Sequence, residues 1–477
     1  MSTTGPRLPG TFQRLWSASL ASNLADGVGM VVMPLLAMRL SDDPFVVSVV
    51  SALTFLPWLV LGVLSGAVVD RADRRRIMGF GALTRAAAYV ALAVIAATVG
   101  IPLWLLFATV LLAACIETLA DGAAQAMVPT LVPTARLDTA NSRFQAGELV
   151  MQGMVALPLG AALFAVAVPL PLVVGAVAYA GAAALVLTLP RRAGRPGPEP
   201  VDALEPERAG GAASAADEAD AAKPAPHESI WAATVSGLRY TFGHRHLRAL
   251  VLVTTMVAMT LQFAQGSLMF YLVRGVGVPE AAIGILTAGM ALGGVAGAIC
   301  SPALSRRFGR RTAMVAATVL AGAAFVVLGL APGGTGGAVV AAVAMAVAAM
   351  AGTAWNVQSS TVRQMIVPGA MLGRVNGATR TLVWGLAPCA ALLGGLVSRV
   401  DLRLPLLVGG ALALVGAVIA VPHLAFVDSI PVRDEVATGD EREDDESDDD
   451  EAEVAEPTSD ATQPDATQPG RTHLVDV

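Results

Sequence analysis

A charged turn between two long apolar runs constrains the fold of this chain more than any other feature. The runs cover about Pro44–Val69 and Ile77–Val99, and each is long enough to cross a bilayer as a helix, which takes about 20 mostly apolar residues. Because the turn is short, the two helices are antiparallel neighbours. Short loops rich in arginine stay in the cytoplasm. The sequence therefore predicts a membrane hairpin with a cytoplasmic turn, whose arginines are Arg71, Arg74, Arg75 and Arg76.

Apolar runs of this length recur along the chain and predict an all-α membrane protein. The 477 residues are 55% hydrophobic and only 14% charged, which is unusual for a soluble domain. We predict twelve transmembrane helices, at about Leu15–Met38, Pro44–Val69, Ile77–Val99, Pro102–Val128, Asn141–Val166, Leu170–Leu189, Leu247–Leu272, Pro279–Leu304, Thr312–Leu330, Ala338–Ser360, Leu372–Val397 and Leu404–Leu424.

The distribution of basic residues orients these helices. Arginine and lysine number 22 on the predicted cytoplasmic side and four in the predicted outer loops. An excess of positive charge marks the cytoplasmic loops of membrane proteins. We therefore expect a multi-pass protein of the cytoplasmic (inner) membrane with both termini in the cytoplasm.

Two segments are too polar to form a core. The stretch 191–228 is rich in Pro, Ala, Gly and acidic residues, and the tail from Asp428 onward holds 18 acidic residues against three arginines. Such compositions favour disorder. Helical spacing resumes after 229 and predicts an amphipathic helix on the inner membrane surface. The predicted parts are the cytoplasmic N-terminus 1–14, a six-helix half 15–190, a disordered cytoplasmic linker 191–228, an interfacial helix 229–246, a second six-helix half 247–426 and a disordered acidic cytoplasmic tail 427–477.

The two predicted halves share an internal repeat. The residues Val132–Pro133, Leu137 and Asn141 recur 235 residues later, and Arg74–Arg75 recur 236 residues later as Arg310–Arg311. Two separate motifs that recur at nearly the same offset indicate parallel copies of a six-helix unit. Parallel repeats of this kind are typical of secondary transporters, whose site lies between the halves near the bilayer midplane.

The turn resembles the signature loop of the major facilitator superfamily. The pattern is glycine, aspartate and arginines at Gly66, Asp70, Arg71, Arg74 and Arg75. Asp73 stands where that loop usually has glycine. The resemblance implies twelve helices in two six-helix parallel pseudo-repeats, and a gating role for these five residues. It also implies that Asp70 binds the start of the eleventh span, near Met371–Arg374, as a cytoplasmic latch.

Other segments are similar to the proton-coupled drug and siderophore exporters of actinobacteria. They are Phe12 to Trp16, Ser22 to Asp26 and the region from Glu117 to Pro158. The fourth span lacks the arginine of other drug-antiporter branches, and the glycine and proline pattern of the fifth span is a degenerate form of the antiporter signature. The resemblance implies efflux by antiport, with multidrug resistance as the associated function.

Ionisable residues within the predicted spans are candidates for the functional site. Each costs at least about 2.5 kcal/mol to insert at bilayer depth, so it needs a partner or a function. We interpret the carboxylates as proton relays or cation ligands, and Arg380 as a partner for substrate or for a carboxylate across the halves. The alternative is a structural ion pair, such as Arg85 with Glu117 or Asp121. The amides Asn23 and Asn356 line a wet cavity or join helices. The candidate carboxylates are Asp26, Glu117, Asp121 and Glu148.

These features predict a proton-coupled secondary transporter that exports small amphipathic molecules, drug-like or siderophore-like, by alternating access. The alternatives are an importer or facilitator of a small metabolite, and a non-transporting receptor or scaffold that uses the acidic tail. The sequence has no phosphate-binding Gly–Lys–Ser/Thr loop and no catalytic constellation, so we expect no enzyme activity, no cofactor and no metal site. The expected partners are the substrate, protons and the lipid bilayer, without nucleic acid, and we expect a monomer.

Overall fold

The computed structural model describes residues 8–61, 68–69, 72–133, 136–194 and 230–429. Within these ranges the chain is helical and contains no strand. The predicted acidic tail and nearly all of the predicted linker fall outside the described residues, as do Gly66, Asp70 and Arg71.

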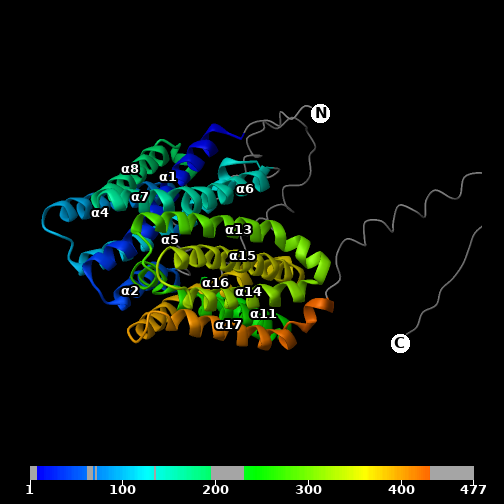
Figure 1. The fold of residues 1–477 in the computed structure, drawn as a ribbon. Coiled ribbons are helices and arrows are strands. Elements are labelled where there is room, and N and C mark those ends of the chain that lie inside the picture. The colour runs from blue at the N-terminus through cyan, green and yellow to red at the C-terminus, as the bar shows by residue number, and fades with distance from the viewer. Residues whose placement is uncertain (1–7, 62–67, 70–71, 134–135, 195–229, 430–477) are drawn as a thin grey trace, which may run out of the picture. The chain divides into compact units, whose positions relative to one another are not determined.

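The first half is a set of long helices joined by short turns (Figure 1). The fifth span is continuous but changes from α to π geometry and back. The elements are α1 (Gly10–Leu40), α2 (Pro44–Val60), α4 (Arg74–Thr98), α5 (Leu103–Leu131), α6 (Leu137–Glu148), η2 (Leu149–Ala156), α7 (Leu157–Val166), α8 (Pro169–Leu187) and η3 (Arg191–Gly194).

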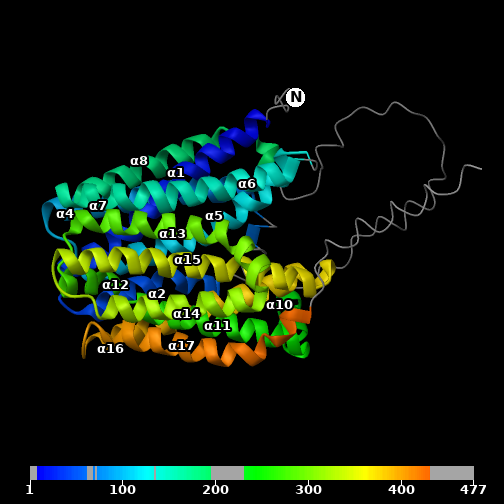
Figure 2. The same ribbon diagram turned by 45° about the vertical axis from the view of Figure 1, so that its right-hand side comes forward.

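The second half follows the same plan (Figure 2). Its elements are α10 (Ile230–Gly243), α11 (Arg245–Gln265), α12 (Leu268–Phe270), η5 (Tyr271–Val276), α13 (Glu280–Phe308), α14 (Arg310–Gly329), α15 (Thr335–Ile366), α16 (Gly369–Ser398), α17 (Leu404–His423) and η6 (Ala425–Ser429).

The predicted fold class is confirmed. Among the described residues, eleven helical segments are long and apolar enough to cross a membrane. The second predicted span is the shorter apolar helix α2, beyond which residues 62–67 are not described. The chain is therefore an all-α, multi-pass membrane protein. Helix α10 lies where the interfacial helix was predicted and packs against α16.

Two aspartates begin helices by capping them. The Asp43 carboxylate accepts a hydrogen bond from the Phe45 N–H at 3.0 Å, and Pro44 occupies the first turn of α2. The Asp73 carboxylate accepts from the Arg76 N–H at 3.2 Å and starts α4. A capping side chain satisfies one of the backbone donors that a helix leaves free at its N-terminus. Asp73, in place of the usual glycine, thus begins the third span.

The internal repeat is visible in the packing. In the first half α8 packs on α1 and α4, and α5 packs on α2 and α4. In the second half the equivalent helix α17 packs on α11 and α14, and α15 packs on α13 and α14. The same helix pairings therefore recur in both halves, as parallel copies require.

The two halves contact each other through matched helices. α2 packs on α16, and α7 packs on α13, while α12 contacts α1 and α2. By contrast, α6 packs on α1, α5 and η2 of its own half. We call the end of the bundle with residues 72–76 and 306–311 the turn end, and the opposite end, with Arg39, Asp43 and Arg399, the ion-pair end. Among the described segments, α7 and α2 join the halves toward the ion-pair end, and η2 contacts α13 nearer the middle of the span.

Candidate functional site

A buried ion pair lies in the core of the first half. The Arg85 guanidinium of α4 lies 2.7 Å from Asp26 Oδ1 of α1, and the two side chains are 2% and 7% exposed. The Tyr179 hydroxyl of α8 donates to the same oxygen at 2.6 Å. Ser22 donates to Asp26 Oδ2 at 3.2 Å and accepts from Arg85 at 3.0 Å. The alternative reading of the sequence paired Arg85 with Glu117 or Asp121, and in the structure its partner is Asp26.

Two tyrosines enclose this pair, and the sequence analysis did not select them. The rings of Tyr89 and Tyr179 meet edge to face, with centroids 5.2 Å apart. The Arg85 guanidinium lies 4.3 Å from the centre of the Tyr179 ring, a cation–π contact. The chain has only four tyrosines, and two of them meet here. A buried tyrosine hydroxyl needs a polar partner, so their positions within apolar spans were the available signal.

A cavity of about 190 Å³ opens beside the pair. Its walls come from five helices of the first half, α1, α2, α4, α5 and α8. The lining is mostly apolar and includes Met30 and the aromatic residues Phe55, Tyr89 and Tyr179, and it also contains Asp26 and Glu117. Such a lining, with a few convergent polar groups, is typical of sites for small organic ligands.

In the described part of the first half, the carboxylates near the cavity outnumber the cations that could pair with them. Glu117 lines the cavity, and among the described residues it has no hydrogen bond or ion pair. Asp121 lies one turn further along α5. Glu148, at the end of α6, is exposed. Since Arg85 is already bound to Asp26, the first half presents acidic groups that a cation or a proton can neutralise.

Arg380 is a cation of the second half that lies near the cavity of the first half. Its guanidinium lies 4.0 Å from the centre of the Trp58 ring of α2, so the contact crosses between the halves. Next to it Phe55 and Trp384 stack with centroids 5.3 Å apart. The charges of Asp121 and Glu148 act on Arg380. The structure therefore places Arg380 at the boundary between the halves, facing the acidic groups of the first.

Two other predicted residues do not line the cavity. The Asn23 amide donates to Ser19 Oγ at 3.3 Å within α1. Asn356 is exposed on α15. Within the described ranges, no three His, Cys, Asp or Glu side chains are grouped as a metal site requires.

Two of the predicted gating arginines join α4 to its neighbours at the turn end. Arg74 is buried and donates to the Ala126 carbonyl of α5 at 3.0 Å. Arg75 donates to the Leu187 carbonyl of α8. Asp70 is outside the described residues, and with it the latch that it was expected to form.

Among the described residues, three ion pairs connect the halves at the ion-pair end. Every pair joins a residue of the first half to one of the second. Arg399 lies 2.5 Å from Asp43 and is bidentate, since its Nε also donates to this carboxylate at 3.0 Å. This hydrogen bond from Arg399 holds the pKa of the Asp43 carboxyl below its ordinary value. The other two are Arg39–Glu280 at 2.6 Å and Arg274–Asp42 at 2.9 Å.

Known proteins resemble the chain in fold over most of its length. The structure of a bacterial homologue of the iron transporter ferroportin in its inward-facing state has a TM-score of 0.68, with 17% identity, and the match covers 88% of this chain and all of that one. The outward-facing state of such a homologue scores 0.52, with 16% identity over 87% and 99% of the two chains. The nucleoside transporter NupG scores 0.61, with 15% identity over 87% and 100%. At these identities the likeness shows the fold alone.

Sequence comparison adds a curated relative and a family. Macrolide efflux protein A of Streptococcus pyogenes is 28% identical over 126 residues, which is 26% of this chain and 31% of that protein. The match thus spans about a third of the relative's length. The sequence profile of the Major Facilitator Superfamily matches residues 15–391. This chain, with its two matched six-helix halves, belongs to the Major Facilitator Superfamily.

Proposed function

We propose that this protein is a proton-coupled exporter of small amphipathic molecules, and that its preferred substrates carry a positive charge. The observation that carries the proposal is the aromatic-walled cavity that contains Asp26 and Glu117 within the membrane-spanning core. Carboxylates at this depth are costly to insert and mark ion or substrate pathways. An apolar wall beside an acidic group suits a molecule with an apolar body and a basic amine.

Glu117 is the proposed exchange group. Asp26 already has Arg85, Tyr179 and Ser22 as partners. Glu117 shares the cavity without a partner among the described residues. A proton and a cationic substrate that compete for one carboxylate bind alternately. This competition would couple the exit of substrate to the entry of protons, and it moves the relay from Asp26, our first sequence candidate, to Glu117.

An inward-facing state is proposed from the arrangement of the helices. The halves join at the ion-pair end, and the better superposition is on an inward-facing structure. The excess of positive charge supports a cytoplasmic turn end, so the site faces the cytoplasm in this state. Importers and exporters both pass through such a state, so export is proposed from the similarity to a macrolide efflux protein. We also propose a monomer in the inner membrane with both termini in the cytoplasm.

The test is substrate-driven proton movement in proteoliposomes that contain the purified full-length protein. A macrolide with a basic amine is the probe, and an internal pH dye reports proton flux. We expect the macrolide to drive proton movement in the wild type, and Glu117→Gln to bind the macrolide more weakly and to move no protons with it. Asp401→Asn, an exposed loop residue with the same charge change, is the control. Proton-independent movement would indicate a facilitator, uptake in the opposite direction an importer, and no movement of any substrate a receptor or scaffold.

A further inference from the structure

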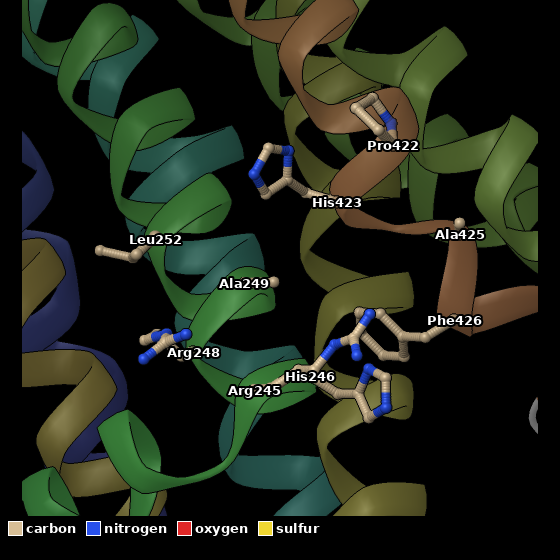
Figure 3. A pocket seen from close by; sticks show the side chains of 9 residues that line it. All are labelled: Arg245, His246, Arg248, Ala249, Leu252, Pro422, His423, Ala425 and Phe426. Carbon is tan, nitrogen blue, oxygen red and sulfur yellow. The ribbon is translucent and has the colours of Figure 1, made fainter.

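A second cavity, of about 450 Å³, lies at the turn end of the second half, outside the site described above. It is formed by the first two turns of α11 and by the end of α17 with η6, as Figure 3 shows. Its lining is basic, with Arg245, His246 and Arg248 on α11 and His423 on α17, while Phe426 closes one side.

Within the described part of the chain, the two arginines of this cavity have no acidic partner. Neither Arg245 nor Arg248 forms an ion pair or a side-chain hydrogen bond among the described residues, and both are exposed. Asp428, the acidic residue of η6, is already bound to Arg311 at 3.2 Å. The start of α11 also has no side-chain cap. Uncapped backbone N–H groups and the positive end of the helix dipole favour an anion at this position. The lining of this cavity therefore favours a negatively charged ligand.

The same cavity continues into an apolar wall. Leu252 lies two turns from Arg245 along α11 and is 51% exposed. Pro422 lies opposite, at the end of α17, with its neighbour Val421 40% exposed. Since α11 and α17 are both long and apolar enough to cross a membrane, exposed apolar side chains on them would meet acyl chains, and the basic side chains at the start of α11 would lie near the headgroups. The order from basic to apolar side chains along α11 matches an anionic amphiphile.

We propose that this cavity binds the phosphate headgroup of an anionic phospholipid. Arginine side chains match the geometry of a phosphate with two parallel N–H donors. The His246 ring is held against Phe426 at 4.5 Å between centroids, and the His423 Nδ1 lies 2.9 Å from the Ile419 carbonyl. Because that carbonyl only accepts, Nδ1 is the donor in this contact. The acidic tail, which follows η6 in the sequence, is the competing occupant.

The first experiment compares lipid association with the purified full-length protein in nanodiscs. Fluorescent phosphatidylglycerol and phosphatidylcholine are the two probes. We expect the wild type to prefer phosphatidylglycerol, and the double variant Arg245→Gln with Arg248→Gln to lose roughly tenfold of this preference. The matched control is Arg191→Gln with Arg192→Gln, which removes two exposed arginines from the turn end of the first half. Equal association of both lipids with the wild type, or an equal loss in both double variants, would overturn the proposal.

The second experiment identifies the occupant even where a charge variant folds poorly. A photo-crosslinking amino acid replaces Leu252 in the full chain, which keeps every basic residue of the cavity. Mass spectrometry after illumination distinguishes the products. A phosphatidylglycerol adduct supports the site, whereas an internal adduct to residues 430–477 assigns the cavity to the tail and overturns it. Displacement of the lipid probe by an equal concentration of inorganic phosphate would show that the free anion is the ligand, and would also contradict the lipid assignment.

Discussion

Arg85 and Asp26 form a 2.7 Å ion pair, although 59 residues separate them and both side chains are almost fully buried. The pair joins α4 to α1, and Tyr179 adds α8 to the same oxygen. Because each charge is desolvated, it depends on its partner. Through these contacts Asp26 holds α1, α4 and α8 together. Glu117 is then the carboxylate of the cavity that can bind a proton or a cation.

Breaking this pair on one side is expected to destabilise the protein strongly. Arg85→Met leaves the Asp26 carboxylate buried without its counter-ion, at a cost of about 3–5 kcal/mol. Thermal unfolding of the purified protein measures the effect. Arg85→Met combined with Asp26→Leu removes both charges and is expected to recover most of the lost stability. Failure of the double variant to recover would show that the charges are not the origin of the loss.

Tyr179→Phe is expected to have a smaller effect. The change keeps the ring over Arg85 and removes only the hydrogen bond to Asp26. Loss of a hydrogen bond to a charged group costs about 1.5–3 kcal/mol. Tyr271→Phe is the matched control, because its hydroxyl binds the neutral Leu328 carbonyl in the second half. A larger loss of thermal stability in the control than in Tyr179→Phe would contradict this ranking.

The contact between Asp43 and Arg399 predicts a dependence on pH. The folded-state pKa of Asp43 is lowered, chiefly by the Arg399 hydrogen bond. The contact therefore contributes its full stabilisation above the unfolded pKa of an aspartate, about 3.9, and loses it as the pH falls through the lower folded value. We expect acidification below this range to favour separation of the halves at the ion-pair end, and Asp43→Asn to favour it at neutral pH.

Distances between spin labels on the two halves measure this separation. Val99 and Val400 are 83% and 81% exposed at the ion-pair end, so both accept a label after Cys115, Cys300 and Cys389 have been replaced by serine. The population at long distance should rise with acid in the wild type and be less sensitive to acid in Asp43→Asn. The same acid response in both proteins would assign the pH dependence to other groups.

The cap of α4 predicts an order among substitutions of Asp73. Asp73→Ala removes the acceptor for the Arg76 N–H and is expected to cost about 1 kcal/mol. Asp73→Ser keeps a capping oxygen and should be nearly neutral. Asp73→Gly, which restores the residue usual in this loop, should cost only a few tenths of a kcal/mol. Thermal unfolding of the three variants tests the order, and equal stability of the alanine and serine variants would exclude the cap as the role of Asp73.

The sequence predicted the helices well because membrane spanning is a local property. A run of about 20 apolar residues has one stable solution in a bilayer, a helix that satisfies its own backbone. The ends were less well predicted. α15 extends over Thr335–Ile366, beyond the predicted Ala338–Ser360. The prediction marked only the apolar part of the helix, and the helix itself continues into the polar residues on either side. The repeat was also readable, since both copies retained the same residues at one offset.

The sequence by itself determined the helices, the two halves, the family and the positions of the charged residues within the spans. Only the tertiary structure decided which of these charges meet. The partners of Asp26 come from 59 and 153 residues away, and the ion pairs between the halves join residues 232 to 356 positions apart. Such contacts depend on how helices rotate and cross when they pack, which no single span encodes. For this reason Arg85 was predicted to have an acidic partner, and packing selected Asp26.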